Sequence, residues 1–335
     1  MDEVFKLVQE LEKIRKIPQF IFIAGIMRTP IIFVRQAVHE FVDKYPDVKE
    51  IDFILESPGG SADLAYMLIR VLRENFEKVN IIIPFWAKSA ATLFALGGST
   101  IIMDEFGQFG PLDVQLKIDD ELPDSEPISG LIDEYSLTTV ENRGIELYQR
   151  MMLTLLKRSN NQNKDQADID IRIKKTILSK QVFEYIFNLY KPLFEQIDPY
   201  KIGEKSRSLA IAERYAERIL EEYNKENLKV GIEDIVDFMV HDCPDHGYIV
   251  DYSIMSKFLL NVKKANEISE DYYKALAKLS LLFFRNSGTY GHVGFFNKKL
   301  LESKKEMKDT NNKASVTTES PEKETTKGEE KTSKE

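Results

Sequence analysis

Hydrophobic positions recur at two spacings in the first third of the chain, and these spacings alternate. Apolar residues every three or four positions predict helices over residues 2–15, 32–42 and 62–76. Between and after them lie short runs of β-branched and aromatic residues, which predict buried strands at 20–24, 51–55, 79–83 and 100–103. Short apolar strands that alternate with helices are typical of a parallel sheet covered on both faces. The predicted fold class is therefore α/β.

The remainder of the chain has mostly helical spacing. Helices are predicted over 136–157, 182–194, 205–223 and 232–240. Two polar stretches separate predicted elements: an acidic surface loop at 116–130, which could instead form a lid over a cleft, and a flexible segment at 159–170. A short strand or turn is expected at 248–252, and the apolar runs 281–284 and 293–296 are expected to pack on the core or on a partner.

The last part of the chain is of a different kind. From about Glu302 onward it consists largely of Lys, Glu, Thr and Ser, and such a segment buries too little apolar surface to offset its ordering entropy. We therefore expect three regions: a core over 1–116, a helical extension that completes the fold over 117–301, and a disordered tail over 302–335.

Composition and charge narrow the class of protein. The chain has 335 residues, of which 43% are hydrophobic, so it can form a sizeable core. A net charge of −9 argues against nucleic-acid binding, because phosphate recognition needs a basic face. The single cysteine, Cys243, excludes an internal disulfide and fits a reducing compartment. The acidic N-terminus and the lack of an apolar run of about 18 residues predict neither a secretory signal nor a membrane span, hence a cytoplasmic protein.

One stretch, from Pro84 to Gly98, joins a predicted strand to a serine at the start of a helical pattern. Ser89 is followed by small residues and then by apolar residues at helical spacing. A serine nucleophile needs a base that removes its proton and donors that hold the developing oxyanion. If Ser89 begins the helix, the Ala90 amide can point toward the reacting carbonyl. The same pattern fits a serine that only caps the helix.

A glycine turn follows the neighbouring strand. Ser57-Pro-Gly-Gly60 comes directly after the run 51–55, and its glycines permit a close backbone approach because they lack a Cβ. A tight strand-to-helix turn would use the same residues. Sites in parallel sheets lie outside the carboxyl ends of the strands, so we expect Gly60 and Ser89 at the same edge.

Taken together, these motifs resemble a known family. The set is Ser57-Pro-Gly-Gly60, Ala87-Lys-Ser-Ala-Ala-Thr92, Leu96-Gly97 and Gly110-Pro-Leu-Asp-Val-Gln115, with a weaker likeness at 245–251. It is similar to the serine dehydrogenase proteinase family, a branch of the ClpP/crotonase superfamily related to the signal peptide peptidase SppA. The resemblance covers roughly residues 17–116. It implies a ClpP/crotonase-like core, serine-dependent peptide-bond hydrolysis without a cofactor, and self-association into a homo-oligomer. It also implies Ser89 as nucleophile, and Gly60 and Ala90 as oxyanion donors.

The general base is where this chain departs from better-known relatives. ClpP-like enzymes carry a His after the nucleophile helix, but residues 109–113 contain none, and the Lys used by SppA-like enzymes has no counterpart between Ile118 and Leu156. The resembled family is described with the order Ser, Asp, His, which implies Asp113 as orienting acid and His246 as base. Asp113 could equally be a loop cap, and His246 a structural hydrogen-bonding residue before a glycine turn.

Other polar residues offer weaker alternatives. Lys205 could serve as a dyad lysine if burial lowered its pKa, although a solvated charge in the first turn of a helix is the common case. Lys88 should not face Ser89 and is expected to pair with an acid or support the local field. His241 and His246 lack a third ligand at a clear spacing, so we expect no metal site.

Two rival functions remain open from the sequence. The chain could be a non-catalytic scaffold or peptide-binding member that keeps the fold without a working base. It could also carry out acyl-thioester chemistry on a crotonase-type core, which uses the same paired amides.

Overall fold

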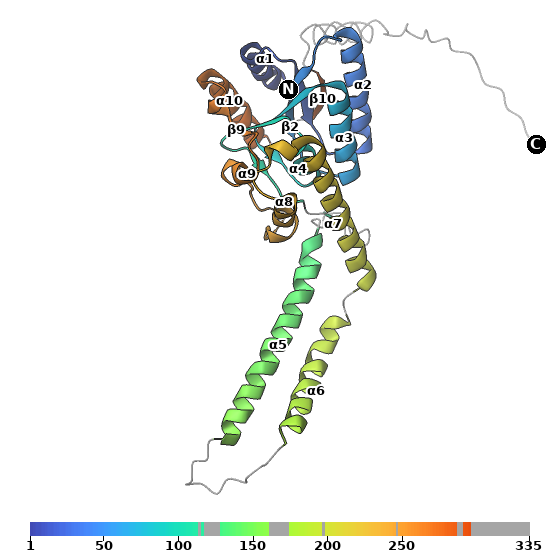
Figure 1. Ribbon diagram of the computed structural model, residues 1–335, viewed down its shortest axis with the longest axis vertical. Coiled ribbons are helices and arrows are strands. Elements are labelled where there is room, and N and C mark those ends of the chain that lie inside the picture. Colours follow the sequence, from blue (N-terminus) through green and yellow to red (C-terminus); the bar gives the residue numbers. More distant parts are fainter. Residues whose placement is uncertain are drawn as a thin grey trace, which may run out of the picture. The chain divides into compact units, whose positions relative to one another are not determined.

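A six-stranded sheet with helices packed around it forms the core of the fold (Figure 1). The computed structural model describes residues 1–112, 115–116, 128–160, 174–195, 198–245, 247–286 and 291–295. Residues 1–295 form one compact unit. The strand order is β10-β1-β2-β3-β5-β9, with bounds β1 (Gln19–Ile23), β2 (Glu50–Glu56), β3 (Lys78–Ile83), β5 (Thr100–Met103), β9 (Val262–Lys264) and β10 (His292–Phe295). All neighbours pair in parallel except β10, which is antiparallel to β1. The predicted α/β class is confirmed.

Two short strand pairs lie outside this sheet. Strand β4 (Trp86–Ala87) pairs in parallel with β6 (Gln108–Phe109). Strand β7 (Gln115–Leu116) pairs antiparallel with β8 (Ile128–Ser129).

Helices cover both faces of the sheet. Helices α1 and α10 pack on each other at one face, and α2 and α3 cover the other (Figure 1). The helix bounds are α1 (Asp2–Arg15), α2 (Arg28–Lys44), α3 (Ala62–Asn75), α4 (Ala90–Ala95), α5 (Gly130–Asn160), α6 (Lys175–Phe194), α7 (Pro199–Ile219), α8 (Ile232–Asp237), α9 (Tyr252–Phe258) and α10 (Glu270–Arg285). Single π-helical turns continue α7 (Leu220–Asn224) and α8 (Phe238–Asp242), and short 3₁₀ turns occupy Lys225–Asn227 and Ala265–Glu267.

The four inner strands β1, β2, β3 and β5 are buried almost throughout, which explains their nearly unbroken apolar sequences. Every residue of β1 is buried, and so is every residue of α4, the short helix that follows Ser89. The Phe53 ring stacks on Phe20 with centroids 4.9 Å apart and meets Phe94 of α4 at the same centroid distance. Full burial of each such ring contributes roughly 1.5–3 kcal/mol. The helix that starts at Ser89 is thereby fixed against the centre of the sheet.

A buried ion pair fixes the amino-terminal end of the sheet. The Asp52 side chain is fully buried, and Arg15 donates to both its carboxylate oxygens at 2.9 Å. Gln19 and Asn80 each donate a further hydrogen bond to the same carboxylate at 2.9 Å. This network joins α1 to β2 at the edge opposite to the strand ends that lead into Ser57 and Ser89.

The predicted elements are confirmed in type, with corrections at segment ends. The loop predicted at 116–130 is wrong at both ends, since Leu116 belongs to β7, Ile128–Ser129 forms β8 and α5 begins at Gly130. The flexible segment predicted at 159–170 is wrong at its start, because α5 extends to Asn160. Residues 117–127, 161–173 and the predicted tail lie outside the described residues. Of the run predicted at 293–296, the described residues Val293 to Phe295 belong to the edge strand β10 and pack on the core. The region boundaries at 116 and 301 stay predictions.

Candidate active site

A second row of strand segments continues beyond the carboxyl ends of the central sheet. Isolated bridges join Ile26 to Gly60 and Ser57 to Ala87, and β4 then pairs with β6, whose Phe109 bridges to Val250. The Lys88 N–H donates to the Ser57 carbonyl at 3.0 Å. This row places the Ser57–Gly60 turn directly beside the segment that leads into Ser89, as the strand order predicts.

Ser89 has an unusual backbone for its position. It precedes α4 with φ 52° and ψ −120°, and its side chain makes no capping hydrogen bond to the helix. An ordinary N-cap serine has an extended backbone and accepts a bond from the first turn. Holding a non-glycine residue in this region costs on the order of 1–3 kcal/mol. Strained turns between a strand and a helix are a known way of presenting a nucleophilic serine. The capping alternative therefore does not describe Ser89.

The glycine turn lies against this serine. Gly59 and Gly60 have φ of 101° and 145°, and a Cβ at Gly59 would lie 2.5 Å from the Lys88 carbonyl oxygen and 3.2 Å from the Ala90 nitrogen. The backbone groups on either side of the Gly60 amide form hydrogen bonds with Ile26. The Gly59 carbonyl accepts from the Ile26 N–H at 2.7 Å, and the Ser61 N–H donates to the Ile26 carbonyl at 3.0 Å. Among the described residues, the Gly60 and Ala90 N–H groups donate to no acceptor.

Ser89, Gly60 and Ala90 open into one cavity of about 540 Å³. A volume of this size suits a small ligand or part of a peptide. Helix α7 supplies one wall, and much of the lining is apolar. The lining residues are Gly60, Ser61, Ala62, Asp63, Ser89, Ala90, Leu93, Leu112, Ser208, Ile211, Ala212 and Tyr215.

Two ionisable groups next to the site are buried. Lys88 is 7% exposed, and burial lowers the pKa of its ammonium, an effect that Asp245 and Cys243 partly oppose. Glu56, the last residue of β2, is 6% exposed, and burial raises its pKa to about 8 although the Trp86 N–H donates to it at 3.2 Å. Sequence reasoning missed Glu56; its only signal is a charge at the end of an apolar run.

The predicted acid and base cannot be placed. Asp113 and His246 lie outside the described residues, and so does the side chain of Lys205. Leu112, the residue before Asp113, lines the cavity. The described residues contain no group of three His, Cys, Asp or Glu side chains arranged to hold a metal ion. No helix within the described ranges has the length and apolarity that crossing a bilayer requires.

Comparison with known proteins bears on the first part of the chain. Residues 14–126 match the model of the family of ClpP-like SDH-type serine proteinases. Two uncharacterized proteins of Methanocaldococcus jannaschii, MJ0137 and MJ1495, are 39% and 38% identical over 71 residues, or 21% of this chain. The matched segment spans only 25% and 24% of those two proteins. The family resemblance predicted from the motifs is thus confirmed. The range 14–126 that matches the family model includes Gly60, Ser89 and Ala90.

Two solved structures are similar over part of the chain. They are a serine-to-alanine mutant of the 1510-N membrane-bound stomatin-specific protease, at 18% identity and a TM-score of 0.28, and a lysine-to-alanine mutant of the same protease with a substrate peptide, at 19% and 0.27. Each match covers 37% of this chain and 59% or 58% of the other.

Proposed function

We propose that the protein is a serine peptidase that hydrolyses peptide bonds through an acyl-enzyme on Ser89. The observation that carries this proposal is the backbone of Ser89, which is strained and uncapped at the start of α4 and opens into a cavity shared with Gly60 and Ala90. The match of residues 14–126 to a family of serine proteinases supports the same reaction.

In the proposed reaction, the Ser89 Oγ attacks the carbonyl carbon of the scissile peptide bond. The carbonyl oxygen becomes an oxyanion, which accepts hydrogen bonds from the Gly60 and Ala90 N–H groups. The base takes the Oγ proton and passes it to the leaving amine, and a water molecule then hydrolyses the acyl-enzyme by the same route. No cofactor is required for these steps.

The assignment of the base follows the family resemblance. His246 would move the proton, because imidazole titrates near neutral pH, and Asp113 would hold its ring in one tautomer. Lys205 is the alternative base. The rival functions are a non-catalytic scaffold, which would not need a reactive Ser89, and acyl-thioester chemistry, which would not need an acyl-enzyme.

A fluorophosphonate probe tests the proposal directly. We expect a covalent adduct on Ser89, located by mass spectrometry, that disappears in Ser89→Ala. An unlabelled Ser89 in folded protein would overturn the peptidase and favour the scaffold. His246→Ala and Asp113→Asn should slow labelling by about 10²-fold or more, whereas Lys205→Ala should not. Full labelling of His246→Ala would overturn the proposed triad.

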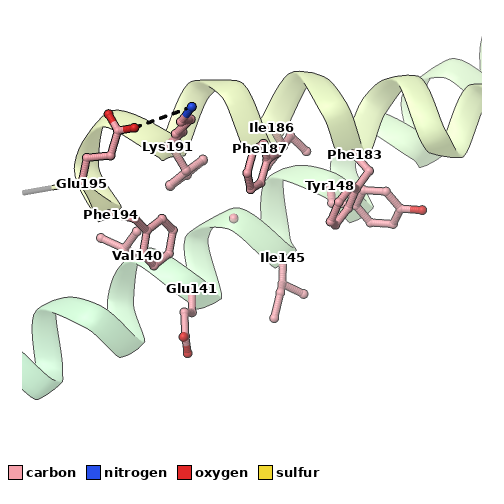
Figure 2. A pocket seen from close by; sticks show the side chains of 12 residues that line it. Val140, Glu141, Ile145, Tyr148, Phe183, Ile186, Phe187, Lys191, Phe194 and Glu195 are labelled. Atoms are coloured by element: carbon pink, nitrogen blue, oxygen red, sulfur yellow. Dashed lines mark ion pairs between the residues drawn. The ribbon is translucent and has the colours of Figure 1, made fainter. Parts of the chain in front are cut away.

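We also infer that the protein is a homo-oligomer, and a groove between α5 and α6 supports this. The two helices lie side by side, and apolar side chains of both, including Ile145, Phe183, Phe187 and Phe194, line a space of about 650 Å³ (Figure 2). Phe183 and Phe187 are 62% and 58% exposed. A helix that is apolar on most sides is normally buried.

The groove favours a second copy of this chain as the partner. Its rim carries both signs of charge, with Glu141 on α5 and the Lys191–Glu195 ion pair at 3.6 Å on α6 (Figure 2). Such a surface can complement itself across a two-fold axis, and two helix pairs would together bury their aromatic rings as a four-helix bundle. The cytoplasmic location stays a prediction from the sequence.

A further inference from the structure

Lys88 stands out because it is a buried cation immediately before the proposed nucleophile. Its side chain is only 7% exposed, and lysine is almost never fully buried without a compensating interaction. Among the described residues no carboxylate forms an ion pair with it.

Instead, the Lys88 ammonium forms a hydrogen bond with the backbone. Lys88 Nζ donates to the Phe109 carbonyl oxygen at 3.3 Å. The stem of the side chain packs on Gly110 so closely that a Cβ there would lie 2.5 Å from Lys88 Cδ. The side chain therefore fills a slot formed by the end of β6.

The main chain of Lys88 is held equally firmly. Its N–H donates to Ser57 at 3.0 Å, and its carbonyl accepts the Ala91 N–H at 2.9 Å. Together with the Nζ contact, these bonds connect Lys88 to the glycine turn, to α4 and to β6. Ser89 therefore lies in a turn that is closed by the hydrogen bond from Ala91 to Lys88.

Phe109 is itself part of a rigid junction. Its N–H and carbonyl exchange hydrogen bonds with Val250 at 2.9 and 3.1 Å, and Gly110 N–H donates to Ala87 at 3.1 Å. The Thr92 Oγ1 lies 2.8 Å from the carbonyl oxygens of both Ala87 and Gly110, so its single proton is shared between these two acceptors. The Lys88 ammonium therefore donates to a carbonyl whose own position is held by these hydrogen bonds.

We propose that Lys88 is a positioning residue for the proposed peptidase reaction. Its ammonium, fixed on the Phe109 carbonyl, keeps the Lys88–Ser89 peptide in place, and so holds Ser89 in the strained conformation that presents Oγ to the cavity. The inference rests on the proposed function, since it assigns Lys88 a role in presenting Ser89. It does not make Lys88 the base.

If Lys88 contributed only to stability, a neutral residue of the same shape would stabilise the folded protein at least as well. The Phe109 carbonyl already accepts from Val250, so removing the ammonium leaves no unpaired acceptor. Methionine in the same slot would avoid the cost of burying a charge, and such replacements are often neutral or stabilising. A role in stability and a role in presenting Ser89 therefore predict opposite results for Lys88→Met.

The test compares Lys88→Met and Lys88→Arg with wild type and with Lys78→Met, a matched control at the exposed start of β3. Thermal unfolding gives stability, and the concentration dependence of fluorophosphonate labelling separates probe affinity from the maximal rate at Ser89. We expect Lys88→Met to keep or raise the melting temperature while its maximal rate falls at least about tenfold with unchanged affinity. Lys88→Arg should recover part of that rate, and Lys78→Met should match wild type.

A pH profile of wild-type labelling tests the charge itself, with Lys88→Met as the comparison. Among the described residues, the titratable groups that act on Lys88 are Asp245 and Cys243, and burial raises the pKa of that thiol to about 11. Because burial lowers the pKa of Lys88, wild-type labelling should decline at alkaline pH, below the range in which exposed lysines lose their proton. Lys88→Met should lack this decline.

The outcomes separate this inference from the proposed function. If wild-type Ser89 is not labelled, the proposed function itself fails. If wild type is labelled but Lys88→Met reacts within about twofold of it, only the positioning role fails. A loss of labelling that parallels a loss of folded protein, with no alkaline decline in wild type, would also overturn the positioning role.

Discussion

The backbone of Gly59 packs directly on Ser89. A Cβ at position 59 would lie 2.9 Å from the Ser89 Cβ, closer than real side chains approach. The glycine turn and the serine therefore form one unit, in which the conformation of each limits the other. This contact explains why position 59 needs a residue without a side chain.

Gly60→Ala should lose both stability and labelling. A Cβ there would lie 2.3 Å from the Ile26 carbonyl oxygen, and φ of 145° is unfavourable for alanine. The backbone must shift, which misplaces the proposed oxyanion donor and should cost about 2 kcal/mol or more. Gly203→Ala is the control: its Cβ meets nothing within 4 Å in α7, so it should stabilise by up to about 1 kcal/mol and label normally. Urea unfolding and probe labelling check both variants.

Ser89→Gly should be more stable than Ser89→Ala. Glycine adopts φ 52°, ψ −120° with little strain, whereas alanine keeps the same Cβ as serine. We expect a difference of about 1 kcal/mol in the free energy of unfolding, with labelling absent from both. Equal stabilities would contradict the assignment of strain to Ser89.

Glu56→Gln should change the pH dependence of stability. The pKa of Glu56 is raised by burial to about 8 from an ordinary 4.5, so folding retains a proton on Glu56 between these pH values. The free energy of unfolding of wild type therefore falls as pH rises through this range, by at most about 1.4 kcal/mol per pH unit. The free energy of unfolding of Glu56→Gln relative to that of wild type should therefore increase up to about pH 8 and stay constant above it.

Urea titrations at about pH 5, 7 and 9 would measure this difference. Glu77→Gln, an exposed position just before β3, is the control and should follow wild type. An advantage of Glu56→Gln that stays constant with pH would show that Glu56 is ionised in the folded protein.

Phe183→Asp together with Phe187→Asp should weaken self-association. Both rings line the α5–α6 groove and are more than half exposed, so a charge there is tolerated in the monomer but not in a buried bundle. Light scattering after size exclusion should show a smaller particle than wild type. Phe33→Asp on α2, where Phe33 is 54% exposed, is the matched control and should leave the particle unchanged. A monomeric wild type would refute the oligomer.

Features set by local spacing could be predicted from the sequence. The helix at 2–15 follows from its apolar period, and Val4, Val8 and Leu11 are the residues it buries. The edge at which Gly60 and Ser89 meet follows from the rule for parallel strand ends. Both depend on neighbours in sequence or on a general property of parallel sheets.

Features set by distant pairing could not be predicted. Phe295 pairs with Phe20 in β1, and nothing in the local sequence of either shows the other. The sequence predicts that Lys88 pairs with an acid or supports the local field, but it does not identify the Phe109 carbonyl as the acceptor, because the path of β6 decides what lies beside the ammonium. The strain at Ser89 is likewise imposed by tertiary contacts and has no sequence signature.

The outer strands of the sheet have a consequence for synthesis. Strands β9 and β10 are the last strands of the described chain to be translated, yet they cover the free edges of β5 and β1. A ribosome-bound chain that ends before Val262 leaves both edges open, and open edges invite pairing between nascent chains. The Phe109–Val250 bridge is likewise missing until Val250 has been translated. Ser89 is thus made early, but its surroundings are complete only after the segment that carries Val250 has been added.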